Sequence, residues 1–235
     1  MQARPVNAAM GWNWLKCGWG LFARDFGTWF LMLLTLIVIA IALNFVPIIG
    51  PIVMAIIMPV LVGGYMYAAQ ELDNGNSISV GSLFQGFRNK PRRNNLLVLG
   101  AIYLAIEIML FIALFTLIGG TAMMNMENSD QINPADIAMS GGTVIGMLLV
   151  MLSGIAIGMG FLFAPALVML DGVAPIESLK ISFSACLHNI LPMLVFGLIY
   201  TVLSILSLIP MGLGFLILIP VTITSMYCSY KSIFR

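Results

Sequence analysis

Charged side chains are the scarcest component of this sequence. Lysine, arginine, aspartate and glutamate make up only 8% of its 235 residues, whereas 61% are hydrophobic. Soluble domains carry roughly 25% charged residues, so the shortage excludes an ordinary water-soluble domain. A formal net charge of +1 also gives nucleic acid no basic surface to bind. The composition indicates a protein whose solvent is largely lipid.

Cysteine and histidine are also rare. The three cysteines, Cys17, Cys186 and Cys228, form no CxxC pair and map to a predicted cytoplasmic, reducing face, so we expect neither a disulfide nor a metal site. The single histidine, His188, lies at a predicted helix boundary and not at the depth that intramembrane serine proteolysis needs. No carboxylate cluster or phosphate-binding glycine loop is present. We therefore expect no enzymatic activity and no cofactor.

Long apolar runs fill the rest of the chain. A bilayer core about 30 Å thick takes roughly 20 apolar residues per helix. Residues 26–70 and 181–230 are uncharged and are broken once each, near Pro47–Pro51 and Pro210–Gly214, so each predicts two spans with a tight return. Residues 94–126, where Glu107 is the only charge, and residues 137–170 predict one span each. The predicted fold class is all-α, a polytopic membrane protein with six transmembrane helices.

The basic residues fall on one side of these spans. They are Arg4, Lys16, Arg24, Arg88, Lys90, Arg92, Arg93, Lys180, Lys231 and Arg235. Because basic residues near span ends are retained in the cytoplasm, both termini are predicted to be cytoplasmic. The first span is too long for the apolar segment of a signal peptide, so no cleavable signal is expected. The only sizeable external segment is a loop predicted at about 119–141.

We expect residues 1–235 to form a single membrane domain. Within it, one order of elements occurs three times: an amphipathic segment, a span, a return and a second span. The predicted repeat units cover about 10–70, 78–170 and 174–231, and Leu97–Tyr103 matches Leu194–Tyr200. The returning spans each carry one proline, Pro59, Pro165 and Pro220. Chance matching between apolar sequences is the alternative explanation.

Each predicted hairpin follows an amphipathic segment with apolar residues at helical spacing. These stripes are Trp12, Leu15, Trp19, Phe22 and Phe26; Val80, Leu83, Phe84 and Phe87; and Ile176, Leu179, Phe183, Leu187 and Ile190. Such segments are typical of helices that lie in the cytoplasmic membrane interface. They are alternatively extensions of the spans that pack on the cytoplasmic face.

The run Phe163–Asp171, followed by Ser178–Phe183 and the pair His188 and Asn189, resembles a pattern in bacterial six-span inner-membrane proteins. That group includes the YciC-like proteins and the membrane domain attached to some glycerophosphodiester phosphodiesterases. The N-terminal Gly11–Trp14 segment is similar to an uncharacterised branch of it. The resemblance implies six helices in the bacterial inner membrane. It implies no established activity and carries over no catalytic residue.

One intramembrane carboxyl group is the first candidate site. Glu107 shares a predicted helix face with Tyr103, and the matching face of the fifth span carries Tyr200 and Ser204. We expect these faces to point into the bundle, where Glu107 acts as a neutral hydrogen-bond donor. Proton-coupled transport and contact with a lipid or partner are the functional alternatives to this structural role.

Two further sets of residues are candidate contact surfaces. Small residues at four-residue spacing let helices approach closely, which predicts a packing seam within the chain or a homodimer face. A basic loop is expected to lie on anionic lipid headgroups, to hold the topology or to dock an acidic partner. The seam is Gly142, Gly146, Gly154 and Gly158, and the basic loop residues are Arg88, Lys90, Arg92 and Arg93.

Two functions remain open from the sequence. The first is a non-catalytic accessory, scaffold or assembly factor for a membrane-protein partner. The second is a small transporter or lipid-handling protein that uses Glu107, although transport sites usually gather several polar groups at mid-membrane. The expected surroundings are a bilayer with anionic headgroups at the cytoplasmic face, and the oligomeric state stays open.

Overall fold

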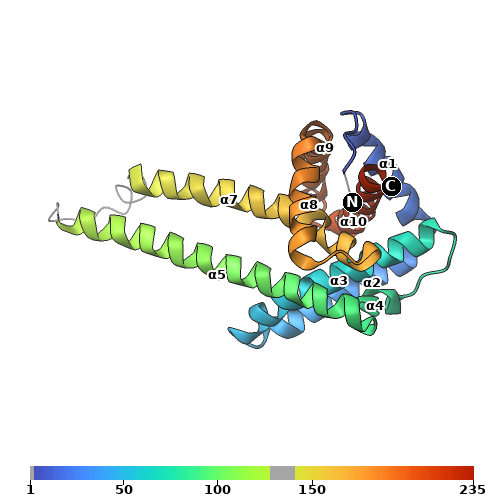
Figure 1. Ribbon diagram of the computed structural model, residues 1–235, viewed down its shortest axis with the longest axis horizontal. Coiled ribbons are helices and arrows are strands. Elements are labelled where there is room, and N and C mark those ends of the chain that lie inside the picture. Colours follow the sequence, from blue (N-terminus) through green and yellow to red (C-terminus); the bar gives the residue numbers. More distant parts are fainter. Residues whose placement is uncertain (1–2, 128–140) are drawn as a thin grey trace. The chain divides into compact units, whose positions relative to one another are not determined.

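A computed structural model describes residues 3–127 and 141–235, with side chains described for 3–116 and 144–235. Within these residues every regular element is a helix (Figure 1). The elements are α1 (Met10–Arg24), α2 (Phe26–Asn44), α3 (Ile49–Asp73), η1 (Val80–Phe84), α4 (Gln85–Arg88), α5 (Lys90–Glu127), α7 (Gly141–Ala166), η2 (Leu167–Asp171), α8 (Pro175–His188), α9 (Ile190–Leu208) and α10 (Phe215–Phe234). η1 is a 3₁₀-helix and η2 a π-helical turn.

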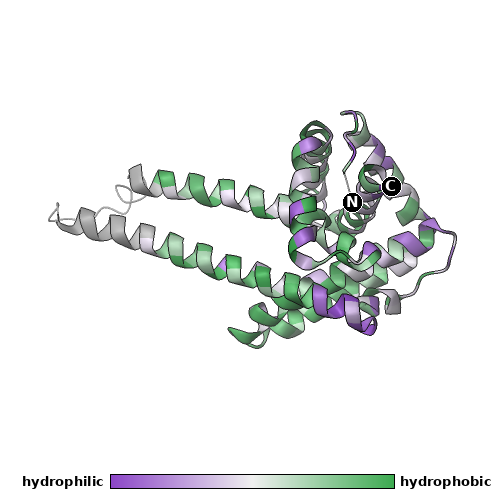
Figure 2. Ribbon diagram, viewed as in Figure 1, coloured by the Kyte–Doolittle hydropathy of each residue, from purple (hydrophilic) through white to green (hydrophobic). Residues whose placement is uncertain are grey.

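Six of these helices are long and apolar enough to cross a membrane, which confirms the predicted number. They are α2, α3, residues Lys90–Thr116 of α5, α7 with η2 (Val144–Asp171), α9 and α10. Lipid offers the backbone no hydrogen-bond partners. In a helix, the backbone N–H and C=O groups bond to each other within the same segment, so a helix can cross lipid. In Figure 2 the hydrophobic colour covers the shafts of these helices, and the hydrophilic colour gathers at the start of α5 and the end of α3.

Two of the predicted tight returns are confirmed as short turns. Between α2 and α3, Ile48 adopts φ 67°, and Gly50 lies so close to Leu43 that an added Cβ would meet its carbonyl group. Between α9 and α10, Gly212 adopts φ 83°, and a Cβ on Gly214 would meet the Cα of Ser207 at 2.6 Å. In both returns a glycine allows the second helix to turn back directly against the first.

The chain divides into two compact units, and each is described by itself. The first comprises residues 1–101 and 159–235, and the second residues 102–158. The buried core of the first unit lies away from the returns: α2 buries only Trp29, Met32 and Leu33, whereas Phe45 and Met211 at the returns are 82% and 97% exposed. The large core side chains are Trp14, Phe22, Trp29, Tyr65, Leu83, Phe163, Tyr227, Tyr230 and Phe234.

Helix α1 divides its predicted stripe between the core and the outside. Leu15 and Phe22 are buried, whereas Trp12, Trp19 and Phe26 are about half exposed. The face that packs inward is centred on Gly11, Trp14, Gly18 and Leu21. Gly11 and Gly18 allow a close approach, because an added Cβ would meet the carbonyl oxygen of Pro192 at 2.4 Å and the backbone nitrogen of Ser225 at 2.6 Å.

Helix α8 turns its predicted stripe almost wholly outward. Ile176, Phe183, Leu187 and Ile190 are exposed, and Leu179 is partly buried. The buried face is made of small and polar residues, namely Ser178, Ser182, Ala185 and Cys186. The middle predicted stripe is split between η1 and α4, and of its residues only Leu83 is fully buried.

Part of the predicted external loop is helical. Helix α5 continues to Glu127, so residues 119–127 are not loop, while 128–140 lie outside the described residues. The apolar run that predicted the third span simply continues the helix past the expected end. The three span prolines lie inside helices as predicted: Pro59 in α3, Pro165 in α7 and Pro220 in α10.

Candidate functional site

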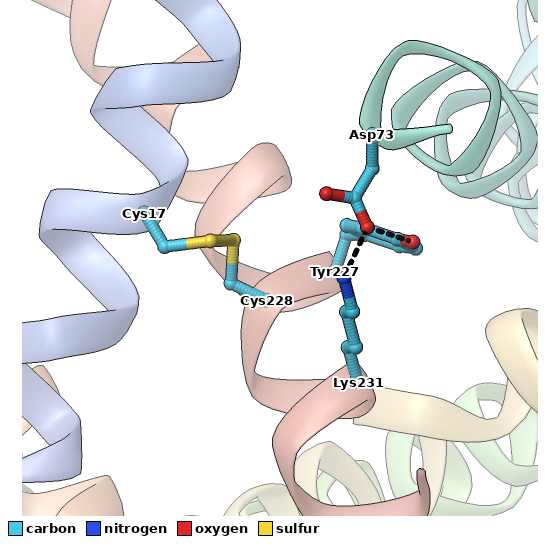
Figure 3. Close-up of polar contacts among 5 residues, drawn as sticks. All are labelled: Cys17, Asp73, Tyr227, Cys228 and Lys231. Atoms are coloured by element: carbon cyan, nitrogen blue, oxygen red, sulfur yellow. Dashed lines mark hydrogen bonds and ion pairs between the residues drawn. A yellow bond between two sulfur atoms is a disulfide. The ribbon is translucent and has the colours of Figure 1, made fainter. Parts of the chain in front are cut away.

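Polar side chains gather where α10 ends. Asp73, the last residue of α3, accepts a hydrogen bond from Tyr227 Oη at 3.0 Å and an ion pair from Lys231 Nζ at 2.6 Å (Figure 3). Tyr227 and Lys231 are one turn apart on α10, so a single carboxylate is engaged by both. The Asp73 side chain is 20% exposed, which strengthens both contacts relative to a fully solvated pair.

A second carboxylate repeats this arrangement. Asp171, at the end of η2, accepts a hydrogen bond from Tyr230 Oη, and Arg235 Nη2 lies 3.4 Å from its other oxygen. We call Asp73, Asp171, Tyr227, Tyr230, Lys231 and Arg235 the α10 polar cluster. Each acid is held by one phenol and one cation, which is the arrangement of a structural clamp. The cluster fastens the ends of α3 and η2 to the last two turns of α10.

The expectation that no disulfide forms is wrong for this structure. Cys17 in α1 and Cys228 in α10 are bonded, with 6.2 Å between their Cα atoms (Figure 3). The prediction rested on the expected reducing compartment and on the absence of a CxxC pair, and the spacing of 211 residues gave no sign that α1 and α10 lie side by side. Cys186 is a free, buried thiol, and burial raises its pKa to about 12.

A buried amide holds the segment before α1. Asn189, at the junction of α8 and α9, is fully buried; its Nδ2 donates to the carbonyl of Arg4 at 3.1 Å and its Oδ1 accepts from the N–H of Val6 at 2.8 Å. The N–H of Arg4 in turn donates to the carbonyl of Ile233 at 2.9 Å. Asn189, one of the polar pair noted in the sequence, thus ties the segment before α1 to the α8–α9 junction, and the backbone of Arg4 ties the same segment to α10.

A serine hydroxyl joins α8 to α7. Ser182 Oγ accepts from the N–H of Phe163 at 3.0 Å and donates to the carbonyl of Met159 at 2.7 Å. These two backbone groups are four residues apart, so the hydroxyl bridges a donor and an acceptor of the helical ladder itself. The Ser182 contact explains why α8 buries its polar face.

The predicted intramembrane polar site is divided between the two units. In the second unit, a side-chain hydrogen bond joins Tyr103 and Glu107 on adjacent turns of α5, and Glu107 is exposed. In the first unit, Tyr200 and Ser204 are partly buried, and Ser204 Oγ has no hydrogen-bond partner among the described residues. The two pairs lie in different units, so their convergence stays a prediction.

The glycines of the predicted seam do not share one environment. Gly146 is buried and lines a space of about 620 Å³ between α5 and α7, together with Leu110, Thr116 and Ser153. A Cβ built on Gly154 or Gly158 meets nothing within 4 Å. The side-chain surroundings of Gly142 lie outside the described residues.

The predicted basic loop is partly folded onto the protein. Arg88 and Lys90 are exposed, whereas Arg92 and Arg93 are partly buried. The Arg92 guanidinium lies against Gly172, which ends η2 with φ +77°. A cation beside a helix C-terminus is favourable, because the last carbonyl groups there carry partial negative charge.

The α10 polar cluster is the site that sequence reasoning missed. A usable signal was present, because two returning spans end in an acid, Asp73 and Asp171, while the last one ends in Lys231 and Arg235. Opposite charges at equivalent helix ends indicate pairing only if those ends lie on the same side of the same unit. The sequence predicted the shared side but not which ends are neighbours.

Comparisons with known proteins agree with the membrane setting. A probable inner membrane protein of Burkholderia thailandensis is 27% identical to this chain, and the match covers all of this chain and 93% of that protein. No solved structure matches. The comparisons support an uncharacterised membrane family but do not extend to the YciC-like proteins or to the phosphodiesterase membrane domain. Residues 26–229 match the family described as domain of unknown function DUF7847, and the chain belongs to that family.

Proposed function

We propose that this chain is a non-catalytic inner-membrane protein that serves as an accessory, scaffold or assembly factor for a membrane partner. The observation that carries the proposal is the open glycine face of α7. Within their own unit, Gly154 and Gly158 have nothing within 4 Å of an added Cβ, and neighbouring Leu152 and Ile155 are also exposed. Helices in lipid associate through small residues that allow close approach, so this face suits a helix of another protein.

The proposed threading puts both termini and the α10 polar cluster in the cytoplasm. In the first unit, the ends of α3, η2 and α10 meet in that cluster, as they would if all three spans returned to one side. The basic residues lie in the segments that lead to and from these ends. Retention of basic segments in the cytoplasm supports this orientation.

A duplicated hairpin is the proposed origin of the first and last repeat units. Helices α2 and α9 both have 19 residues and begin 164 positions apart, after Asp25 and Asn189 respectively. The glycines that close the two returns, Gly50 and Gly214, are separated by the same 164 positions. The helix starts and the return glycines are thus separated by the same number of residues. This agreement supports descent from one hairpin more strongly than similarity between apolar sequences does.

The segments before these two hairpins are proposed to lie in the membrane interface. Trp12, Lys16 and Trp19 are exposed on α1, and Ile176, Lys180 and Phe183 are exposed at the same spacing on α8. An exposed apolar stripe that carries a lysine suits the boundary between headgroups and acyl chains.

The test is recovery of partners from native membranes. The tagged full chain is extracted with its surrounding lipid in polymer nanodiscs, and proteins that co-purify are quantified by mass spectrometry. We expect one stoichiometric membrane protein, lost in Gly154→Leu/Gly158→Leu and kept in the control Ile155→Leu, which changes shape but not size on the same helix. Recovery of the chain without a stoichiometric protein, or equal recovery with both variants, would contradict the accessory role.

A small transporter or lipid-handling protein is the second candidate. It is favoured by the hydrogen-bonded Tyr103 and Glu107 and by the space of about 620 Å³ that begins one turn further along α5, at Leu110. The chain reconstituted in liposomes with a fluorescent phospholipid tests this function, because dithionite bleaches only the outer leaflet. Transbilayer exchange that exceeds empty liposomes and is abolished by Glu107→Gln would favour this candidate over the first.

A further inference from the structure

A groove of about 590 Å³ lies between α1, α9 and α10, wholly within the first unit. Its walls are apolar side chains such as Leu203, Leu206 and Ile217, and it extends to Gly214 at the return between α9 and α10. The hydroxyl of Ser207 also lines the groove, but it already donates to the carbonyl of Leu203 at 2.8 Å. The interior therefore suits a hydrocarbon chain and offers little to a polar ligand.

The α1 wall of the groove carries a lysine that lies against an indole ring. Lys16 Nζ lies 5.3 Å from the centroid of the Trp12 ring, and Trp19 lies one turn away on the same face of α1. Trp12 and Trp19 are 46% and 54% exposed. Tryptophan concentrates at the depth of lipid headgroups, and a lysine there attracts anionic ones.

The charge of Lys16 is available to an external anion. The ion pairs found in the described part of the chain belong to Lys231 and Arg235 of the α10 polar cluster, and Lys16 takes part in neither. An ammonium group at the mouth of a hydrocarbon groove is the complement of a phosphate attached to an acyl chain. A membrane phospholipid carries both groups, the phosphate and the acyl chain, in one molecule.

We propose that this groove binds one anionic phospholipid, with the phosphate on Lys16 and one acyl chain lying between α9 and α10 toward Gly214. Trp12 and Trp19 flank the headgroup at the mouth of the groove. The inference requires only that the chain lies in a bilayer, and it does not depend on the accessory role. A lipid held here would complete the packing of α1 against the α9–α10 hairpin, where Leu206 and Ile217 are now 52% and 43% exposed.

Tryptophan fluorescence tests the proposal in the full chain. Trp14 and Trp29 are 1% and 0% exposed and should be shielded, so quenching by brominated acyl chains reports mainly Trp12 and Trp19. Nanodiscs of phosphatidylcholine are doped with either brominated phosphatidylglycerol or brominated phosphatidylcholine at equal mole fraction. We expect the anionic quencher to be preferred by about fivefold, the effect of one lysine near a membrane surface.

Two pairs of variants separate a specific site from bulk lipid. Lys16→Gln should abolish the preference for phosphatidylglycerol, while Lys180→Gln, its counterpart on α8 and not a lining residue of this groove, should keep it. Ile217→Phe fills the groove and should reduce quenching, whereas Ile205→Phe, on exposed α9 surface outside the lining, should not. Equal quenching by both lipids in the unmodified chain, or no response to Lys16→Gln and Ile217→Phe, would overturn the proposal. Release of a hydrophobic peptide instead of phospholipid on denaturation would overturn it as well.

Discussion

Removal of the Ser182 hydroxyl should loosen the contact between α8 and α7 by a calculable amount. Ser182 Oγ makes two hydrogen bonds to the α7 backbone, to Phe163 and Met159, and the side chain is fully buried. Ser182→Ala deletes both bonds and leaves a methyl group of nearly the same size. The matched control is Ser184→Ala, because Ser184 is exposed and its hydroxyl lies 3.4 Å from His188 Nδ1.

The size of the effect follows from the number of bonds. A buried hydrogen bond contributes about 0.5–1.5 kcal/mol in soluble proteins, and polar contacts between membrane helices average about 0.6 kcal/mol. Two bonds therefore predict that Ser182→Ala lowers the free energy of unfolding by about 1–3 kcal/mol. Ser184→Ala should change it by less than about 0.5 kcal/mol, as is usual for a surface substitution.

Titration of the purified protein with sodium dodecyl sulfate measures both values. The fluorescence of Trp14 and Trp29 reports unfolding, because these side chains are buried in the core of the same unit. Equal stability of the two variants would refute the reasoning. It would mean that the N–H of Phe163 and the carbonyl of Met159 re-form their own helical bond once the hydroxyl is removed.

Three further predictions concern other buried positions. Burial raises the pKa of Cys186 to about 12, so the folded protein should resist thiol alkylation at pH 8. Since the unfolded thiol ionises near pH 8.5, the contribution of this group to stability should be fully present below that pH and should fall as the pH rises toward 12. Cys17→Ser removes a bond to Cys228 that spans 211 residues and should lower stability by up to about 5 kcal/mol. Gly64→Ala should destabilise the fold far more than Gly27→Ala, because a Cβ at Gly64 meets a backbone carbonyl of η1 and one at Gly27 meets nothing within 4 Å.

Each of these predictions has a clear contrary result. Rapid labelling of Cys186 in the folded protein, with Cys17→Ser and Cys228→Ser also in place, would show that the thiol is accessible. A chain that runs identically with and without reductant on a denaturing gel would show that the disulfide is not formed. Equal detergent stability of the two glycine variants would mean that α3 and η1 do not approach as closely as described.

The spans could be predicted from the sequence because length and apolarity decide them. A helix about 20 residues long satisfies its own backbone in lipid, so α2 and α9 follow from composition without knowledge of their neighbours. The two tight returns could be predicted because proline and glycine interrupt the apolar runs there. The extension of α5 to Glu127 could not be predicted, because hydropathy indicates where a span can lie and not where the helix ends.

The inward faces could not be predicted because apolarity alone does not mark the core side of a helix in lipid. In water an apolar stripe marks the core side of a helix, but lipid tails are as apolar as leucine. On α8, Phe183 and Leu187 are exposed, and Ser182 and Ala185 pack inside, where small size allows close contact and the hydroxyl finds a backbone partner. The pairing of Asp73 with Lys231 escaped for a related reason, since it depends on which helix ends are neighbours.

The contact between α1 and α10 has a consequence for biosynthesis. Thr224 Oγ1 donates to the carbonyl of Gly18, 206 residues earlier in the chain, at 2.9 Å. When α1 leaves the ribosome, α10 has not been translated, and the spans that lie between them in the chain are made first. The part of the inward face of α1 around Gly18, which packs on Ser225 and Thr224, therefore stays uncovered until α10 has been made. A nascent chain that stops before α10 would keep this part of α1 uncovered, so its exposure distinguishes an incomplete chain from a folded one.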